Sequence, residues 1–152
     1  MSVEVKFEDK EIRRVVNGLI KNLGVISNRG KEYVTILSSV VIQDIIDHFE
    51  REEGDDGRWV PWSSTYRKYM IAIGKGGNLI LSDTGKLRSG WQPARYRAAK
   101  DGILWYNPVS YAAQHDEGIS PYPRRKFTWL SDAAMGEIER QTVKFLEDVK
   151  VK

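Results

Sequence analysis

Hydrophobic positions at both ends of the chain recur with the period of an α-helix. From Phe7 to Leu23 they are spaced three or four residues apart with charged residues between, which predicts an amphipathic helix ended by Gly24. A second series between Lys31 and Glu53 predicts a longer helix, whose apolar stripe is wide enough to contact more than one element. A third helix is expected to begin after Ser131, a good N-cap, and to end near Val149. Its expected buried stripe is Ala134, Ile138, Thr142, Phe145 and Val149.

The segment after the second helix changes character. Residues 50–57 contain no apolar side chain and two glycines, which predicts an exposed connector with low burial. Ser63 or Ser64 is placed to cap a short helix, for which the expected buried stripe is Tyr66, Met70 and Ile73. The run Gly74–Gly77 then predicts a mobile loop. Ser82–Thr84 offers capping residues for a further helical turn.

A period of two replaces the helical period beyond Trp91. One face of the expected strand carries Ala94, Tyr96 and Ala98, and the other carries Arg95 and Arg97. Asp101-Gly102 is a turn signal, and Ile103–Tyr106 follows it as a second strand. The sequence therefore predicts a β-hairpin with one basic face.

A short helix ended by Gly118 is expected next, followed by a rigid proline-containing loop over 121–126. The fold class is thus α+β, with amphipathic helices at both ends packed around a small antiparallel β-sheet with a central hairpin. A length of 152 residues suits a single domain, 1–152. We divide it into a helical front (1–53), a basic α+β middle (58–130) and a C-terminal helix (131–149).

Composition excludes several classes of protein. The chain has no cysteine, which rules out disulfide frameworks, thiolate metal sites and thiol nucleophiles. Its longest apolar runs are a few residues, far below the roughly 20 that a membrane-spanning helix needs. The first ten residues lack the apolar segment of a secretory signal. We therefore expect no membrane association, and a protein that acts where it is made or leaves the cell by lysis.

The net charge of +3 is unevenly distributed. Residues 1–56 carry 8 basic and 12 acidic side chains, residues 57–130 carry 12 and 4, and residues 131–152 carry 4 and 5. A basic middle between acidic flanks indicates a surface that faces a polyanion or self-association of unlike patches, with ordinary solvated charge as the alternative. The candidate interface or DNA-facing residues are Arg58, Arg67, Lys68, Arg88, Arg95, Arg97, Lys100, Arg124, Arg125 and Lys126.

Candidate catalytic chemistry is sparse. His48 lies near Asp44 and Asp47, and His115 precedes two carboxylates, so either is a possible metal ligand or general base. Neither has a second histidine four residues away, which favours a packing role. The glycine-rich run at 74–77 does not match the phosphate-binding loop pattern. We assign no catalytic residue, metal or cofactor.

Four motifs in a fixed order carry a resemblance to a known family. They are Trp59-Val-Pro-Trp-Ser-Ser-Thr-Tyr-Arg-Lys, Leu79-Ile-Leu-Ser-Asp-Thr-Gly-Lys-Leu-Arg-Ser89, Tyr111-Ala-Ala-Gln-His-Asp-Glu-Gly118 and Pro123-Arg-Arg-Lys-Phe-Thr-Trp-Leu-Ser131. In this order the chain, over about residues 55–150, resembles the phage virion morphogenesis family of tail-completion and head–tail joining proteins, especially of Mu-like phages and prophages. The matching residues are Thr84, Gly85, Leu87, Tyr111, Ala112, His115, Gly118, Pro123 and Phe127. The chain departs from the family pattern at Thr128-Trp129, where Leu-Gly is usual, and at Gly90, where an apolar residue is common.

The resemblance implies a non-enzymatic virion component at the neck of a tailed phage, assembled in the host cytoplasm. Such a protein forms a ring, with the hexameric symmetry of the tail, as a tail terminator or joining layer through which DNA passes. Its implied partners are copies of itself, neighbouring connector and tail-tube proteins, and DNA without sequence specificity. The implied role of the motif residues is to shape the fold, Gly85 and Gly118 by relieving backbone constraints and Tyr111 and Phe127 by packing.

Two other functions stay open. Basic residues interleaved with aromatic ones in the middle of the chain suit a nucleic-acid-binding module, although no known nucleic-acid motif is present. A hydrolase or metal enzyme built around His115 is the other alternative.

Overall fold

The computed structural model describes residues 3–5, 10–23, 28–99 and 102–151. Within it the chain forms two compact units, and neither is a continuous stretch of sequence. The first unit comprises 1–3, 45–91 and 107–129, and the second comprises 4–44, 92–106 and 130–152. Each unit is therefore built from segments that lie far apart along the chain.

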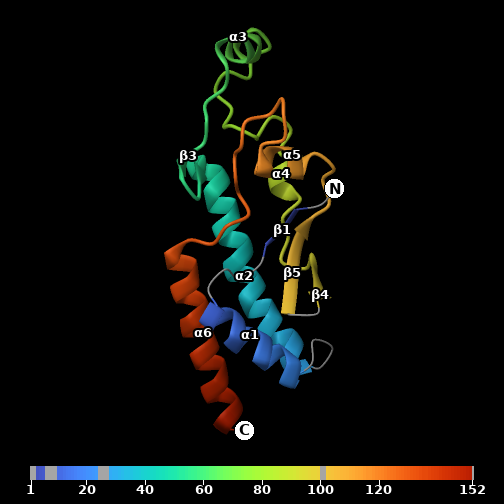
Figure 1. Ribbon diagram of the computed structural model, residues 1–152, viewed down its shortest axis with the longest axis vertical. Coiled ribbons are helices and arrows are strands. Elements are labelled where there is room, and N and C mark those ends of the chain that lie inside the picture. The colour runs from blue at the N-terminus through green and yellow to red at the C-terminus, as the bar shows by residue number, and fades with distance from the viewer. Residues whose placement is uncertain (1–2, 6–9, 24–27, 100–101, 152) are drawn as a thin grey trace. The chain divides into compact units, whose positions relative to one another are not determined.

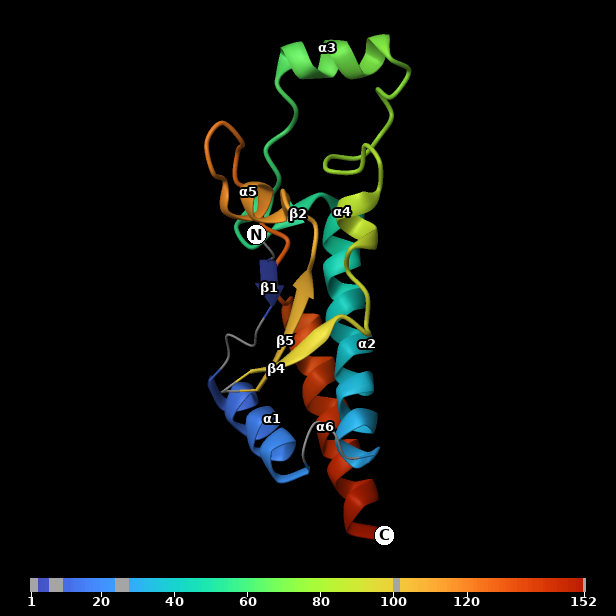
Figure 2. The ribbon, with the colours of Figure 1, turned by 90° about the vertical axis from the view of Figure 1, so that its right-hand side faces the viewer.

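Three helices and a sheet make up most of the second unit (Figures 1 and 2). The helices are α1 (Lys10–Leu23), α2 (Asn28–Arg51), whose residues from Ile45 belong to the first unit, and α6 (Asp132–Val151). The sheet has the strand order β1-β5-β4, with β1 at Val3–Val5, β4 at Tyr96–Ala99 and β5 at Gly102–Asn107. These elements confirm the α+β fold class and all three predicted helices.

Buried hydrogen bonds join α2 to α6. The Tyr33 hydroxyl lies 2.8 Å from Thr142 Oγ1, and the Tyr33 ring stacks on Phe145 with centroids 4.9 Å apart. The Asp44 carboxylate accepts hydrogen bonds from both the backbone N–H and the hydroxyl of Ser131. Ser131 Oγ in turn accepts the Ala134 N–H, so this residue is the N-cap that the sequence predicts.

The predicted hairpin is confirmed in β4 and β5. The strands pair antiparallel with Tyr96 opposite Trp105 and Ala99 opposite Gly102, while Lys100 and Asp101 of the turn lie outside the described residues. Side chains of β5 alternate, and Ile103 and Trp105 are buried. The Trp105 indole N–H donates to Ser38 Oγ at 2.8 Å, which fixes β5 against α2.

The first unit contains short elements around an aromatic core. These are β2 (Glu53–Gly54), β3 (Gly57–Arg58), α3 (Ser64–Ala72), α4 (Lys86–Ser89) and α5 (Ala112–Glu117). Phe127 packs against Phe49 and Trp91, with ring centroids 5.1 and 6.1 Å away, and the Phe49 and Trp59 rings form a T-shaped pair. The Trp59 indole N–H donates to the Lys126 carbonyl, so the segment before α3 is tied to the loop after α5.

One expectation for the first unit is incomplete and another is wrong. Residues 50–57 are mostly exposed, as predicted, but they also contribute to a small hairpin of β2 and β3 in which Gly54 is buried. Ser63 does cap α3, but of its predicted stripe only Met70 is buried, whereas Tyr66 and Ile73 are 42% and 44% exposed. Figure 2 shows α3 (green) at one end of the first unit, joined to its other elements by segments that form neither helix nor strand.

His48 has a packing role. Its ring stacks on Trp129 with centroids 3.9 Å apart, and Nε2–H donates to the Trp129 carbonyl at 3.0 Å.

Within the described ranges, no three His, Asp or Glu side chains are grouped to hold a metal ion. In the same residues no helix has the length and apolar character to cross a membrane.

Replacing Ser38 by alanine tests the hydrogen bond between β5 and α2. The Ser38→Ala change leaves the buried Trp105 N–H without an acceptor, and we expect it to lower the free energy of unfolding by about 1–3 kcal/mol. Urea denaturation followed by tryptophan fluorescence measures this. Ser39→Ala, one residue further along the same helix and exposed, is the control and should change the value by less than about 0.5 kcal/mol. Equal effects of the two changes would contradict the assignment.

Candidate partner-binding cavity

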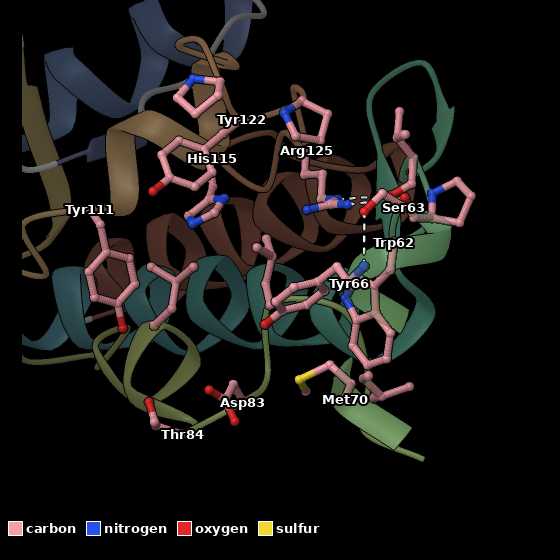
Figure 3. A pocket seen from close by; sticks show the side chains of 17 residues that line it. Trp62, Ser63, Tyr66, Met70, Asp83, Thr84, Tyr111, His115, Tyr122 and Arg125 are labelled. Carbon is pink, nitrogen blue, oxygen red and sulfur yellow. Dashed lines mark hydrogen bonds between the residues drawn. The ribbon is translucent and has the colours of Figure 1, made fainter. Parts of the chain in front are cut away.

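A cavity of about 610 Å³ lies entirely within the first unit (Figure 3). Segments from α3, α4, α5 and the loop over 119–125 contribute to its wall. Its apolar and aromatic lining is Val60, Pro61, Trp62, Tyr66, Met70, Leu79, Leu81, Leu87, Tyr111, Pro121, Tyr122 and Pro123. Its other lining residues are Ser63, Asp83, Thr84, His115 and Arg125. Five of the nine residues that match the family pattern, namely Thr84, Leu87, Tyr111, His115 and Pro123, thus meet around one space.

Positive backbone angles shape the two helices at this cavity. Gly85, immediately before α4, has φ +74°, and Gly118, which ends α5, has φ +72°. A Cβ atom at Gly118 would also lie 2.7 Å from the backbone of Arg124. A residue with a side chain at either position is therefore strained, and at Gly118 it also blocks the return of the following loop.

The Asp116 carboxylate holds that loop in place. It is buried and accepts hydrogen bonds from the backbone N–H groups of Phe127 and Thr128, at 2.8 and 3.0 Å. It also accepts the Thr128 hydroxyl at 2.6 Å and lies 3.6 Å from Lys126 Nζ. These bonds fix residues 126–128 on α5 and place the Phe127 ring in the aromatic core.

Arg125 reaches the cavity as a buried cation. Only 7% of its surface is exposed, and its guanidinium donates to the backbone carbonyls of Val60 and Pro61 at 2.8 and 3.3 Å. In Figure 3 the Arg125 side chain extends between His115 and Ser63. Burial lowers the pKa of Arg125, and the charge of Glu52 only partly opposes this effect. No carboxylate in the described part of the chain forms an ion pair with it.

His115 faces the same cavity. Its ring packs against Tyr122 and Tyr111, with centroids 4.7 and 6.1 Å away, and Nδ1 is buried without a hydrogen-bond partner. Burial, together with the positive charge of Arg125, lowers the pKa of His115 from its ordinary value of 6.5. The imidazole is therefore neutral at pH 7 and adds no second positive charge to the site.

Both departures from the family pattern have structural partners. Gly90 is buried against Asn107, whose side-chain oxygen would lie 2.3 Å from a Cβ atom at position 90. Asn107 uses its amide to donate to the Leu87 carbonyl and its oxygen to accept the Val109 N–H. Thr128 is one of the groups held by Asp116, and Trp129 is the stacking partner of His48. These residues replace the usual ones with specific contacts of their own.

The candidate DNA-facing residues do not form one exposed set. Arg125 is buried, which is contrary to an exposed position on the protein surface, and Lys100 lies outside the described residues. Arg88 pairs with Glu50, Arg124 with Asp55 and Asp56, and Lys126 with Asp116. Arg58, Arg67 and Lys68 are exposed in the first unit, whereas Arg95 and Arg97 belong to the second. Much of the basic charge of the middle segment is thus used within the protein.

Sequence reasoning missed Arg125 and Asp116 as the polar residues that organise the cavity. Arg125 stands in a run of three basic residues and Asp116 beside Glu117, so neither differs from its neighbours in the pattern. The two prolines at 121 and 123 were the available signal that the loop is rigid enough to carry a buried charge.

Comparisons with family models, curated protein sequences and solved structures found no match to this chain.

Removing the Asp116 carboxylate tests the anchor of the loop. In Asp116→Ala the buried N–H groups of Phe127 and Thr128 lose their acceptor, and we expect the free energy of unfolding to fall by about 3 kcal/mol or more. Chemical denaturation measures the change. Glu117→Ala is the control, because Glu117 is the adjacent carboxylate and is exposed, and it should change the value by less than about 0.5 kcal/mol. A loss below about 1 kcal/mol in Asp116→Ala would contradict this role.

The lowered pKa of His115 predicts a pH dependence with a definite sign. The unfolded chain binds the proton more readily than the folded protein, so stability from this group is present above pH 6.5 and decreases as the pH falls through that value. The chain has two histidines, so NMR should give two imidazole signals, and His115→Gln identifies one of them. We expect that signal to titrate below 6.5 and the His115→Gln protein to lose part of its acid sensitivity. A midpoint at or above 6.5 would overturn the assignment.

Proposed function

We propose that this protein is a structural component of a tailed-phage virion that completes or terminates the tail and joins it to the head. In this role it forms a ring, with the sixfold symmetry of the tail, at the neck of the particle. Neighbouring connector and tail-tube proteins contact the ring, and phage DNA passes through it without sequence-specific contacts.

The observation that carries this proposal is the meeting of the resemblance motifs in one place. The second and third motifs end and begin more than 20 residues apart, yet Thr84 and Leu87 line the same cavity as Tyr111, His115 and Pro123. Other motif residues shape that wall, since Gly85 and Gly118 have positive φ angles and Phe127 and Ala112 are buried. The clustering of motif residues around one cavity supports an architecture shared with the phage family more strongly than short sequence matches do.

The surface of the first unit supports a role in assembly. Large apolar side chains on and near α3 are more than a third exposed, namely Val60, Tyr66, Tyr69, Ile71, Ile73 and Leu79. A concentration of exposed apolar side chains is typical of a surface that binds another protein. Exposed Arg58, Arg67 and Lys68 in the same unit offer contacts to acidic neighbours or to DNA.

Deleting the gene from its phage or prophage tests the proposal. We expect DNA-filled heads and separate or wrongly finished tails in electron micrographs, with infectious titre reduced by several orders of magnitude. Normal infectious particles without the protein would exclude it.

A pair of glycine variants sharpens this test. Complementation with Gly118→Ala should fail, because the new Cβ atom has both an unfavourable φ angle and a backbone collision at Arg124. Gly77→Ala should restore particle assembly, because the space around Gly77 is open and its φ angle is not positive. Restoration by Gly118→Ala would show that the motif wall is not needed.

A further inference from the structure

The cavity of the first unit combines a buried cation with an apolar lining. Arg125 has no ion-paired carboxylate in the described part of the chain, and its two hydrogen bonds go to backbone carbonyls through Nε and Nη2. A buried guanidinium is costly unless an anion compensates it, and carbonyl oxygens neutralise none of its charge. The charge of Arg125 is therefore uncompensated within the described residues, and a bound anion would compensate it.

The one carboxylate in the cavity wall is already engaged. Asp83 forms an ion pair with Lys75, with Oδ1 and Nζ 2.5 Å apart, and in Figure 3 it lies on the side of the cavity away from Arg125. Glu52 acts on Arg125 only at longer range and accepts the Ile80 N–H. Neutral His115, on the other side of Arg125, supplies no negative charge.

The apolar lining of the cavity indicates that the bound molecule also has apolar groups. Aromatic rings of Trp62, Tyr66, Tyr111 and Tyr122 face the space, and a volume of about 610 Å³ is enough for a few side chains. The cavity is open, because Val60, Tyr66, Leu79, Tyr111 and Tyr122 are each more than a third exposed. The apolar surface continues past the cavity to Tyr69, whose ring lies 6.0 Å from that of Tyr66. A small molecule would leave this surface uncovered, whereas a protein segment would cover it.

We propose that this cavity binds a segment of a partner protein that presents a carboxylate side chain next to an aromatic or aliphatic one. The carboxylate pairs with the guanidinium of Arg125, and the apolar neighbour packs among the tyrosines and Trp62. Charge complementarity selects the segment, and apolar burial supplies most of its affinity. If the virion assignment holds, this site is where a neighbouring subunit or neck protein engages the ring.

Two capped peptides test the proposal on the full-length protein. One has the sequence leucine–phenylalanine–glutamate–leucine, and the other has glutamine in place of glutamate. We expect the glutamate peptide to bind about tenfold tighter or more in calorimetric titrations, because only it carries the charge that Arg125 needs. Equal affinities for the two peptides, or no binding of either, would overturn the proposal. Equal affinity for 3-phenylpropanoate would also overturn it, in favour of a small carboxylic acid.

Two arginine variants locate the effect. Arg125→Gln should remove the preference for glutamate, whereas Arg124→Gln, which removes the same charge from an exposed adjacent position, should keep it. Preference retained in a folded Arg125→Gln protein would contradict the site. Because Arg125 also supports the Val60 and Pro61 carbonyls, Tyr122→Ala provides a second test should Arg125→Gln not fold. Tyr122→Ala should weaken both peptides about equally, and unchanged affinities would exclude the cavity as the binding place.

The experiments test the virion function and the peptide-binding site independently. Absence of the glutamate preference removes the site but leaves the particle experiments to decide the function. Normal particles after gene deletion remove the function but leave a measured peptide preference in place.

Discussion

The first unit depends on the buried carboxylate of Asp116. Residues 119–130 contain no helix or strand, so their buried backbone N–H groups need acceptors from elsewhere. Asp116 supplies them for Phe127 and Thr128 from the last turn of α5. With these two residues fixed, Phe127 enters the core between Phe49 and Trp91, and Arg125 is directed inward two residues earlier. One acidic side chain thus sets the position of both an aromatic core residue and a buried cation.

Arg125 then connects the loop to the segment before α3. Its donors meet the carbonyls of Val60 and Pro61, and the Trp59 indole meets the Lys126 carbonyl from the opposite direction. The two segments do not pair as strands, so hydrogen bonds from side chains to the backbone hold them together. The result is a cavity whose walls are fixed near Arg125 and more exposed toward α3. This arrangement suits a site that receives its missing charge from a partner.

Much of the secondary structure is predictable because its signals are local. Helical periodicity with good caps gives α1, α2 and α6, and an Asp-Gly turn between alternating residues gives the β4–β5 hairpin. The prediction that Tyr66 and Ile73 of α3 are buried is wrong, because periodicity identifies an apolar face but not whether another element covers it. The β2–β3 hairpin is missed because its polar residues carry no alternation. For α3 the deciding fact is the lack of a tertiary contact over its apolar face, and for β2–β3 it is a short local pairing of polar residues.

The sequence marks some residues of the candidate site but not the cavity that they line. The ordered motifs mark Thr84, Leu87, Tyr111, His115 and Pro123, which the structure brings together. Charge counting, by contrast, treats Arg124, Arg125 and Lys126 as equivalent, although one is exposed, one buried and one half-buried. Their different burial depends on Asp55, Asp116 and the Val60 carbonyl, which lie 10 to 69 residues away in sequence. Burial of a charge is decided by such distant partners, and no local pattern encodes it.

Positions 90 and 107 share one space in the fold, so the side-chain volumes at the two positions are coupled. The space that an apolar residue at position 90 would occupy is filled by the amide of Asn107, which also serves the Leu87 carbonyl. A larger residue at 90 is therefore compatible with this fold only if position 107 becomes smaller and the Leu87 carbonyl finds another donor. Divergence at these two sites must proceed jointly, so in related chains the identity of one residue should report the identity of the other.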